Sequence, residues 1–314
     1  MVLAALAVVV PTAGCTLPPP PGDAPLRYRD VVFPSVGVTK DLTYGSAPDN
    51  AGNPVTLKLD LYQPSGDTVA RRPAVVYVHG GGFSHGDKSA GAGFASYLAQ
   101  RGFVVVSINY RLLAPLGCGG QRDPSPECEA AAIAAQHDAQ AAVRWLRANA
   151  TTYRIDPSRI AMAGASAGAI TSLLVGWRPE DPGSSGNPGF SSAIRAAVSI
   201  SGGVPTTEFI TRDDAPAIFF HGTADHTVFY DWAVLNAGAM YNLRILVVFE
   251  SFEGAGHGLV QAGYGPVIHQ QSDYFLYVVL DLGHADGQSA AAARAFAPYV
   301  RSLRQRYPQA PLAP

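Results

Sequence analysis

The glycine-rich pentapeptide GASAG, at residues 164–168, constrains this chain more than any other stretch. It follows an apolar run that begins at Ile160, and it precedes a predicted helix over residues 167–177. A G-x-S-x-G pattern between a strand and a helix is typical of a sharp turn that exposes a serine hydroxyl. Glycines on both sides keep side chains out of that turn, and the helix directs backbone N–H groups toward the reacting atoms. We therefore expect Ser166 to be a nucleophile, with a plain small-residue turn as the structural alternative.

Composition limits the kinds of partner that this chain can have. The 314 residues are 47% hydrophobic and 15% charged, which is enough for a large core and typical of one α/β domain. The formal net charge is −2 and the chain has no basic run. We therefore expect no nucleic-acid partner and no electrostatic attraction to an anionic membrane. A small, uncharged substrate fits this charge balance.

Predicted strands and helices alternate along the chain with short connections, as in a doubly wound parallel sheet. Residues 30–44 and 56–62 predict a leading antiparallel hairpin, because the second run alternates apolar and polar residues. Buried strands are predicted at 74–78, 103–108, from 160, 194–201, 217–221 and 245–249; helices are predicted at 89–101, 129–149, 167–177, 228–241, 265–282 and 289–307. We expect one doubly wound α/β unit, with a sheet of about eight mostly parallel strands and helices on both faces. A single domain would cover residues 30–314.

The N-terminal region has the pattern of an export signal, predicted here over residues 1–14. Val2 to Val10 is an apolar run that is too short to span a bilayer. The usual preceding basic residues are missing, so the start codon lies upstream or the signal is atypical. Thr12 to Cys15 resembles a lipobox, in which Cys15 would be lipidated, and residues 15–29 would form a proline-rich tether. We expect an exported protein, either secreted or tethered to a membrane of the cell envelope.

Two further cysteines, Cys118 and Cys128, lie ten positions apart in a loop rich in glycine and proline. Outside the cytoplasm such a pair is expected to oxidise to a disulfide. Closing so short a loop stabilises the fold by roughly 2–3 kcal/mol in the chain-entropy model and would hold the loop in one shape. Two free thiols are the alternative. No cysteine and histidine spacing indicates a metal site.

A nucleophilic serine needs a base, and the base needs a carboxylate to orient it. Asp225 follows the predicted strand 217–221, and His257 lies between two glycines after the strand 245–249. We therefore expect Asp225 to be the acid and His257 the base. The alternatives are Asp213, Asp214, Asp231, His221 and His226. Those acids are more typical of surface charge, and the two histidines lie at the strand end that supplies the acid, where His221 is more typical of a core residue.

The motif His79-Gly80-Gly81-Gly82 follows the buried strand 74–78. Attack on a carbonyl creates a negative oxygen, and losing one fixed donor to that oxygen typically costs about 3 kcal/mol of barrier. Because glycine has no side chain, its N–H group can approach the oxygen closely. We expect the N–H groups of Gly81, Gly82 and Ala167 to form an oxyanion hole, with His79 holding the loop; a flexible turn is the alternative.

Between about Leu57 and His257 the chain resembles the esterase/lipase branch of the α/β-hydrolase superfamily that carries the His-Gly-Gly-Gly motif. The motifs that carry the resemblance are HGGGF, NYRL, GASAG, HGTADHTV and GAGHG. Ala165 stands where hormone-sensitive-lipase-like enzymes usually have aspartate, and the acid lies in GTAD in place of D-P-L-x-D. The chain is therefore more similar to feruloyl- and acetyl-xylan-esterase relatives and to general carboxylesterases. The resemblance implies a serine carboxylesterase without a cofactor.

No long apolar insertion resembles a lipase lid, so we expect short- to medium-chain acyl esters as substrates. Five aromatic residues are candidate walls of the substrate pocket: Phe83, Tyr110, Trp177, Phe229 and Trp232. One alternative is a peptidase or amidase of the same fold, although such chains usually carry a large extra domain. Another is a non-catalytic binding protein on a hydrolase fold, which would be expected to have lost a triad residue or the glycines. The sequence indicates no particular oligomeric state.

Overall fold

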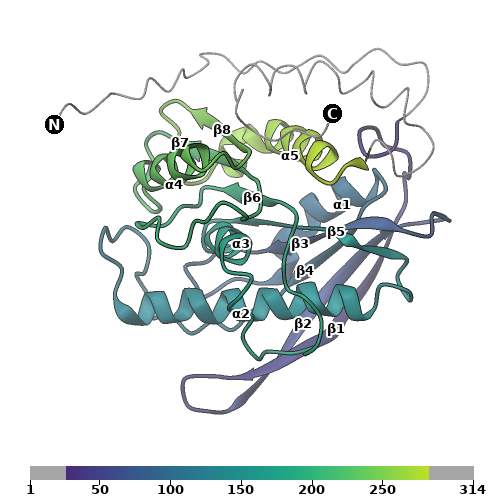
Figure 1. The fold of residues 1–314 in the computed structure, drawn as a ribbon, viewed down its shortest axis with the longest axis horizontal. Coiled ribbons are helices and arrows are strands. Elements are labelled where there is room, and N and C mark those ends of the chain that lie inside the picture. The colour runs from purple at the N-terminus through teal and green to yellow at the C-terminus, as the bar shows by residue number, and fades with distance from the viewer. Residues whose placement is uncertain (1–25, 283–314) are drawn as a thin grey trace.

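The computed structural model describes residues 26–282. The predicted export signal at 1–14, the tether up to residue 25 and the predicted helix at 289–307 lie outside the described residues. Eight strands form one sheet in the order β1-β2-β4-β3-β5-β6-β7-β8 (Figure 1). The strands are β1 (Val36–Pro48), β2 (Pro54–Pro64), β3 (Arg72–Val78), β4 (Val104–Ile108), β5 (Ile155–Ala165), β6 (Ala197–Ile200), β7 (Ala217–Gly222) and β8 (Val247–Phe252).

The strand directions confirm the predicted sheet. β1 pairs antiparallel with β2, and β2 pairs antiparallel with β4. Every other neighbouring pair, from β3 with β4 to β7 with β8, is parallel. Parallel strands end at the same edge, so the loops after β3, β5, β7 and β8 all meet there. This edge is where the sequence analysis expects the functional residues.

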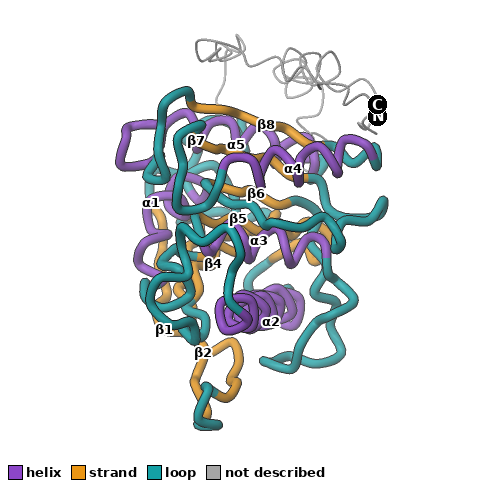
Figure 2. Tube along the Cα trace, turned by 90° about the vertical axis from the view of Figure 1, so that its left-hand side faces the viewer, coloured by secondary structure: helices purple, strands orange, loops and turns teal. Residues whose placement is uncertain are grey.

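Helices cover both faces of the sheet (Figures 1 and 2). The helices are η1 (Lys88–Gly91), α1 (Ala92–Ala99), α2 (Pro126–Ala148), α3 (Ala167–Trp177), α4 (Tyr230–Asn242), the π-helical turn η2 (Val260–Tyr264) and α5 (Gly265–Val279). Alternate residues of β3 enter two different cores. Val76 and Val78 pack with side chains of α2, α3 and α4, whereas Val75 and Tyr77 pack with those of α1 and α5. Burial on both faces explains why residues 74–78 of this strand form a continuous apolar run.

Most predicted elements differ from the structure by a few residues at their ends, and two of these differences have a clear cause in backbone pairing. The first strand begins at Val36 and not at residue 30, because the N–H groups of Val32 and Phe33 donate to the carbonyl of Gln100, directly after α1, at 3.0 and 2.9 Å. The last strand continues to Phe252, beyond the predicted end at residue 249. Glu250 and Ser251 pair with Phe220 and His221 of β7, although both are polar and interrupt the apolar run. Tertiary pairing outweighs local propensity at both places.

Asp156 fixes the start of β5, the strand that carries Ser166. Its carboxylate accepts hydrogen bonds from Arg71 at 2.9 Å, from the Ser158 hydroxyl at 2.6 Å and from Arg159 at 3.0 Å. Burial alone would raise the pKa of Asp156, but these donors outweigh burial and bring its pKa to about 2. The ionised carboxylate therefore stabilises the folded state.

We expect Asp156→Asn to lower the free energy of unfolding at neutral pH, and to lower it less as the pH falls from about 4 toward 2. The folded-state pKa of about 2 lies below the ordinary value of 3.8, so the stabilisation is present above pH 3.8 and is lost toward pH 2. Urea unfolding at a series of pH values measures the difference between wild type and variant. The exposed Asp123, changed to Asn, is the control. A difference that does not vary with pH would contradict the role of the charge.

Candidate active site

Ser166 lies in a sharp turn between β5 and α3. Its backbone has φ 55° and ψ −121°, a conformation that residues other than glycine rarely adopt. A Cβ atom on Gly164 would lie 2.2 Å from the Gly168 carbonyl oxygen, and one on Gly168 would lie 2.0 Å from the Val78 carbonyl oxygen. Both positions therefore require glycine for close approach of the backbone. The strained turn holds the serine at the end of the strand and directly at the start of the helix.

The structure brings Ser166, Asp225 and His257 into one hydrogen-bonded chain. His257 Nε2 lies 2.8 Å from Ser166 Oγ, and His257 Nδ1 lies 2.8 Å from Asp225 Oδ2. Asp225 follows β7 and His257 follows β8, so the three side chains come from three parallel strand ends. With the Nδ1 proton donated to the carboxylate, Nε2 is free to accept the serine proton. This arrangement can activate the hydroxyl for attack.

Asp225 is held in its ionised form. Its Oδ1 accepts hydrogen bonds from the N–H groups of Thr227 at 2.8 Å and Val228 at 3.1 Å, and its side chain has no solvent exposure. Burial alone would raise the pKa of Asp225, but hydrogen bonds from His221, His257 and Thr227 hold that pKa well below its usual range. The carboxylate therefore orients His257 without taking its proton.

The other acids and imidazoles considered from the sequence have different surroundings. Asp231 forms an exposed ion pair with Arg122 at 2.7 Å, and Asp214 accepts from Thr211. Asp213 and His226 are exposed. His221 is fully buried, as expected of a core histidine, but its Nε2 lies 3.2 Å from Asp225 Oδ2. That contact was not predicted, because the sequence does not show which way a strand-end side chain turns.

The glycine loop after β3 lies beside Ser166. Gly81 has φ 120° and Gly82 has φ 58°, and a Cβ on Gly81 would lie 2.0 Å from the His85 carbonyl oxygen. Within residues 26–282, the backbone N–H groups of Gly81, Gly82 and Ala167 have no hydrogen-bond acceptor. Three donors beside the serine are therefore free to bind an oxygen atom of a ligand.

His79, the first residue of the glycine loop, holds the loop through contacts with Tyr110 and Gly80. Its ring stacks on Tyr110 with centroids 4.4 Å apart, and its Nδ1 lies 2.6 Å from the Gly80 carbonyl oxygen. The Tyr110 hydroxyl in turn donates to the His79 carbonyl at 3.1 Å. Burial lowers the pKa of His79, and the Gly80 carbonyl opposes this only in part. The packing of the two rings holds the loop beside the nucleophile.

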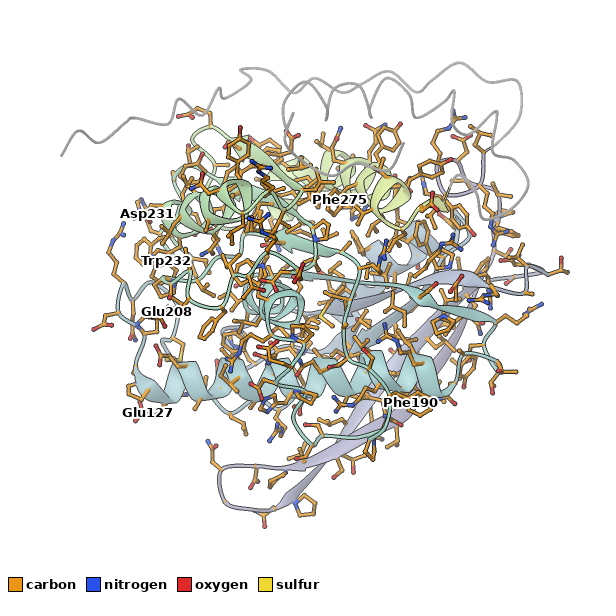
Figure 3. All side chains as sticks on the ribbon, in the orientation of Figure 1. Glu127, Phe190, Glu208, Asp231, Trp232 and Phe275 are labelled. Atoms are coloured by element: carbon orange, nitrogen blue, oxygen red, sulfur yellow. A yellow bond between two sulfur atoms is a disulfide. The ribbon has the colours of Figure 1, made fainter. Side chains whose placement is uncertain are left out.

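A cavity of about 1160 Å³ contains Ser166, His257 and the glycine loop. Of the five predicted aromatic walls, Phe83 and Trp232 line it; Trp232 is labelled in Figure 3. Three predictions need correction, because Tyr110, Trp177 and Phe229 do not line the cavity. Tyr110 packs under His79, Trp177 is only 1% exposed at the end of α3, and Phe229 packs edge-on against Trp232. Proximity in sequence does not determine which side of an element faces the cavity.

Aliphatic side chains that the sequence analysis did not select line much of the cavity. Ile170 and Leu174 lie one and two turns after Ser166 on the same face of α3. They belong to the core of α2, α3 and α4, whereas Leu259 belongs to the core of α1 and α5. The cavity therefore extends over both sides of the sheet edge. Helical spacing from Ser166 was the signal that could have identified Ile170 and Leu174.

The loop between β4 and α2 forms another wall of the cavity. Cys118 and Cys128 are bonded as a disulfide with Cα atoms 5.7 Å apart, and both line the cavity with Leu116. The Gly120 N–H donates to the Thr227 carbonyl at 2.8 Å. The loop is therefore tied to α2 on one side and to the segment after Asp225 on the other.

Ser201 is a further residue that the sequence analysis missed. It follows β6 with φ 56°, and its hydroxyl donates to the His257 carbonyl at 2.9 Å. Its own N–H donates to the Phe220 carbonyl at 2.8 Å. Ser201 thereby fixes the backbone of His257 relative to β7. The Ser-Gly-Gly run after a buried strand was the available signal.

In residues 26–282, no group of three or more His, Cys, Asp or Glu side chains is placed to hold a metal ion. The helices of this same part of the chain are all too short or too polar to cross a membrane.

Comparisons with known proteins point to esterases. Residues 59–202 match the family model named BD-FAE. Esterase B1 of Culex pipiens is 32% identical to this chain over a region that covers 37% of this chain and 21% of Esterase B1. Esterase LipI of Mycobacterium tuberculosis is 33% identical over a region that covers 44% of this chain and 38% of LipI. The matched region thus spans less than two fifths of these relatives. An esterase of Thermogutta terrifontis solved with butyrate bound is 25% identical, with a TM-score of 0.64 over 81% of this chain and 96% of that one. The structure of the same esterase phosphorylated by paraoxon has a TM-score of 0.63 with this chain.

Proposed function

Starting from an α/β-hydrolase fold whose sequence and structure are similar to those of esterases, we propose that this chain is a serine carboxylesterase. One observation carries the proposal. Ser166 Oγ, His257 and Asp225 form a continuous chain with both heavy-atom distances at 2.8 Å. A fixed, partly buried chain of this kind is what activates a serine hydroxyl at neutral pH.

In the first half of the reaction, Ser166 Oγ attacks the ester carbonyl while His257 Nε2 takes the hydroxyl proton. The carbonyl oxygen becomes negative and is bound by the free N–H groups of Gly81, Gly82 and Ala167. His257 then returns the proton to the alcohol oxygen, the carbon–oxygen bond breaks and the alcohol leaves. In the second half, water adds to the acyl-enzyme with the same proton transfers and releases the acid.

We propose that the substrates are esters of short to medium acyl chains. The cavity is lined by aliphatic and aromatic side chains near Ser166, which suits an uncharged apolar chain. Butyrate is the bound acid in the similar Thermogutta terrifontis esterase. The volume of about 1160 Å³ is large enough for a substrate with a bulky alcohol.

We also propose that the protein is exported and that it is either secreted or attached to a membrane through Cys15. The disulfide between Cys118 and Cys128 supports the proposal, because such bonds persist mainly outside the cytoplasm. The net charge of −2 and the absence of a basic run give no support for a nucleic-acid partner.

We expect a fluorophosphonate probe to label the wild-type protein and to leave Ser166→Ala unlabelled. The same substitution should lower ester hydrolysis by roughly a millionfold, because no other hydroxyl contacts His257 Nε2 in residues 26–282. Gel fluorescence and the hydrolysis of p-nitrophenyl butyrate measure the two effects. Thr206→Val, which removes another hydroxyl from the same cavity, is the control and should keep both. Labelling that persists in Ser166→Ala would refute the assigned nucleophile.

A substrate panel tests the chain-length proposal. We expect kcat/KM to be highest for acyl chains between acetate and octanoate in a p-nitrophenyl series, and low for palmitate and for emulsified long-chain triglyceride. Hydroxycinnamoyl esters and aminoacyl amides belong in the same panel, because they distinguish related esterases and peptidases. Faster hydrolysis of the emulsified oil than of p-nitrophenyl acetate or butyrate would show that the proposal is wrong.

Cell fractionation of the native host tests export. We expect the protein outside the cytoplasm, with Cys118 and Cys128 resistant to thiol labelling until a reductant is added. If Cys15 is lipidated, Cys15→Ser should move the protein from the membrane fraction to the soluble fraction of the envelope. Recovery in the cytoplasm with two reactive thiols would contradict export.

A further inference from the structure

His221 is a second imidazole, besides His257, that contacts the carboxylate of Asp225. It is the next-to-last residue of β7 and is fully buried. Its Nε2 lies 2.9 Å from the Val228 carbonyl oxygen and 3.2 Å from Asp225 Oδ2. The same Oδ2 atom lies 2.8 Å from His257 Nδ1. Two imidazoles therefore face a single carboxylate oxygen.

The hydrogen-bond partners assign the proton of His221. Nε2 faces two acceptors, the Val228 carbonyl and Asp225 Oδ2, so Nε2 carries a proton that both can share. Nδ1 is buried and has no hydrogen-bond partner among the described residues. A proton on Nδ1 would be a buried donor without an acceptor, which is unfavourable. His221 is therefore a donor through Nε2 toward the acid.

We propose that His221 is a positioning residue that holds Asp225 in the orientation required by His257. This inference rests on the proposed function. The Asp225 carboxylate is held at both oxygens, by the Thr227 and Val228 N–H groups at Oδ1 and by the two histidines at Oδ2. Rotation of the carboxylate would break bonds at both oxygens. Because His221 also contacts the Val228 carbonyl, it joins the strand end to the loop that carries the acid.

The position of His221 on a strand makes it suited to this role. β7 is an interior strand that pairs with β6 and β8, and His221 itself pairs with Ser251 of β8. Tyr230 packs edge-on against the imidazole, with centroids 5.9 Å apart, and its hydroxyl lies 2.7 Å from Ser251 Oγ. The donor is therefore fixed by the sheet and not by a mobile loop, and a fixed donor preserves the geometry of the acid and base.

Two substitutions separate a donor from a residue that only fills space. In His221→Gln, the side-chain amide can reach the region of the imidazole Nε2 and donate to Asp225. In His221→Leu, the volume is largely retained but the donor is lost. We expect His221→Leu to lower kcat for p-nitrophenyl butyrate by roughly 10- to 100-fold, the usual effect of losing a hydrogen bond to a charged group. His221→Gln should recover most of kcat. KM should change less than threefold for both, because His221 does not line the cavity.

His221→Asn is a third variant, useful if the leucine variant does not fold. Its shorter amide cannot reach Asp225 Oδ2, so a polar group remains but the bond is lost, and kcat should fall as for leucine. His269→Leu is the matched control, since that imidazole packs between Phe94 and Tyr97, away from the site, and its loss should leave kcat unchanged. Thermal unfolding of every variant verifies that the compared proteins are folded.

Wild-type kcat in a folded leucine or asparagine variant would overturn the inference. Equal losses of kcat in folded glutamine, leucine and asparagine variants would also overturn it, because a donor would then make no difference. A wild-type protein that neither hydrolyses the ester nor reacts with a fluorophosphonate would refute the proposed function, and with it this inference. An active wild type with unaffected His221 variants would refute the inference alone.

Discussion

The proposed activity requires the hydrogen-bonded chain from Asp225 through His257 to Ser166 to keep its geometry. Each link is 2.8 Å long, so a shift of about an ångström in any loop would break it. The three residues lie far apart in sequence and share only the edge at which parallel strands end. A sheet with cores on both faces is rigid enough to hold three loop ends at this precision.

Close backbone contacts join the loops at this edge. Gly168 lies so near the Val78 carbonyl that a Cβ would be 2.0 Å from its oxygen, which ties the serine turn to the strand before the glycine loop. Gly222 makes a similar approach, with a Cβ position 2.2 Å from the Ala255 carbonyl oxygen, and the Ala224 N–H donates to that oxygen at 2.9 Å. The acid and base loops therefore contact each other directly. Glycine at these positions serves the packing of neighbouring loops more than flexibility.

The sequence predicted the sheet, the leading hairpin and the site residues that have glycines beside them. Apolar runs identified the strands because both faces of the sheet are buried, and glycines marked the turns beside Ser166 and His257. The hydrogen bond from Ser201 to the His257 carbonyl could not be predicted, because it joins segments that are distant in sequence. The contact of His221 with Asp225 could not be predicted either, because the sequence does not show which way a strand-end side chain turns. The residues that line the cavity were predicted only in part, because the sequence does not show which side chains of an element face it. Two of the five predicted aromatic residues line the cavity, whereas Ile170, Leu174 and Phe209, which were not predicted, also line it.

Burial changes along the hydrogen-bonded chain in a way that suits proton transfer. The side chain of Asp225 has no exposure, whereas that of His257 is 27% exposed and lines the cavity. The charge that must stay fixed is therefore sealed away from water by His221 and by backbone N–H groups. In the proposed reaction, the imidazole of His257 passes a proton between serine, alcohol and water, and it lines the cavity in which these groups would meet. A buried charge is costly unless it is fully hydrogen-bonded. The donors around Asp225 therefore allow its carboxylate to be buried while His257 remains partly exposed.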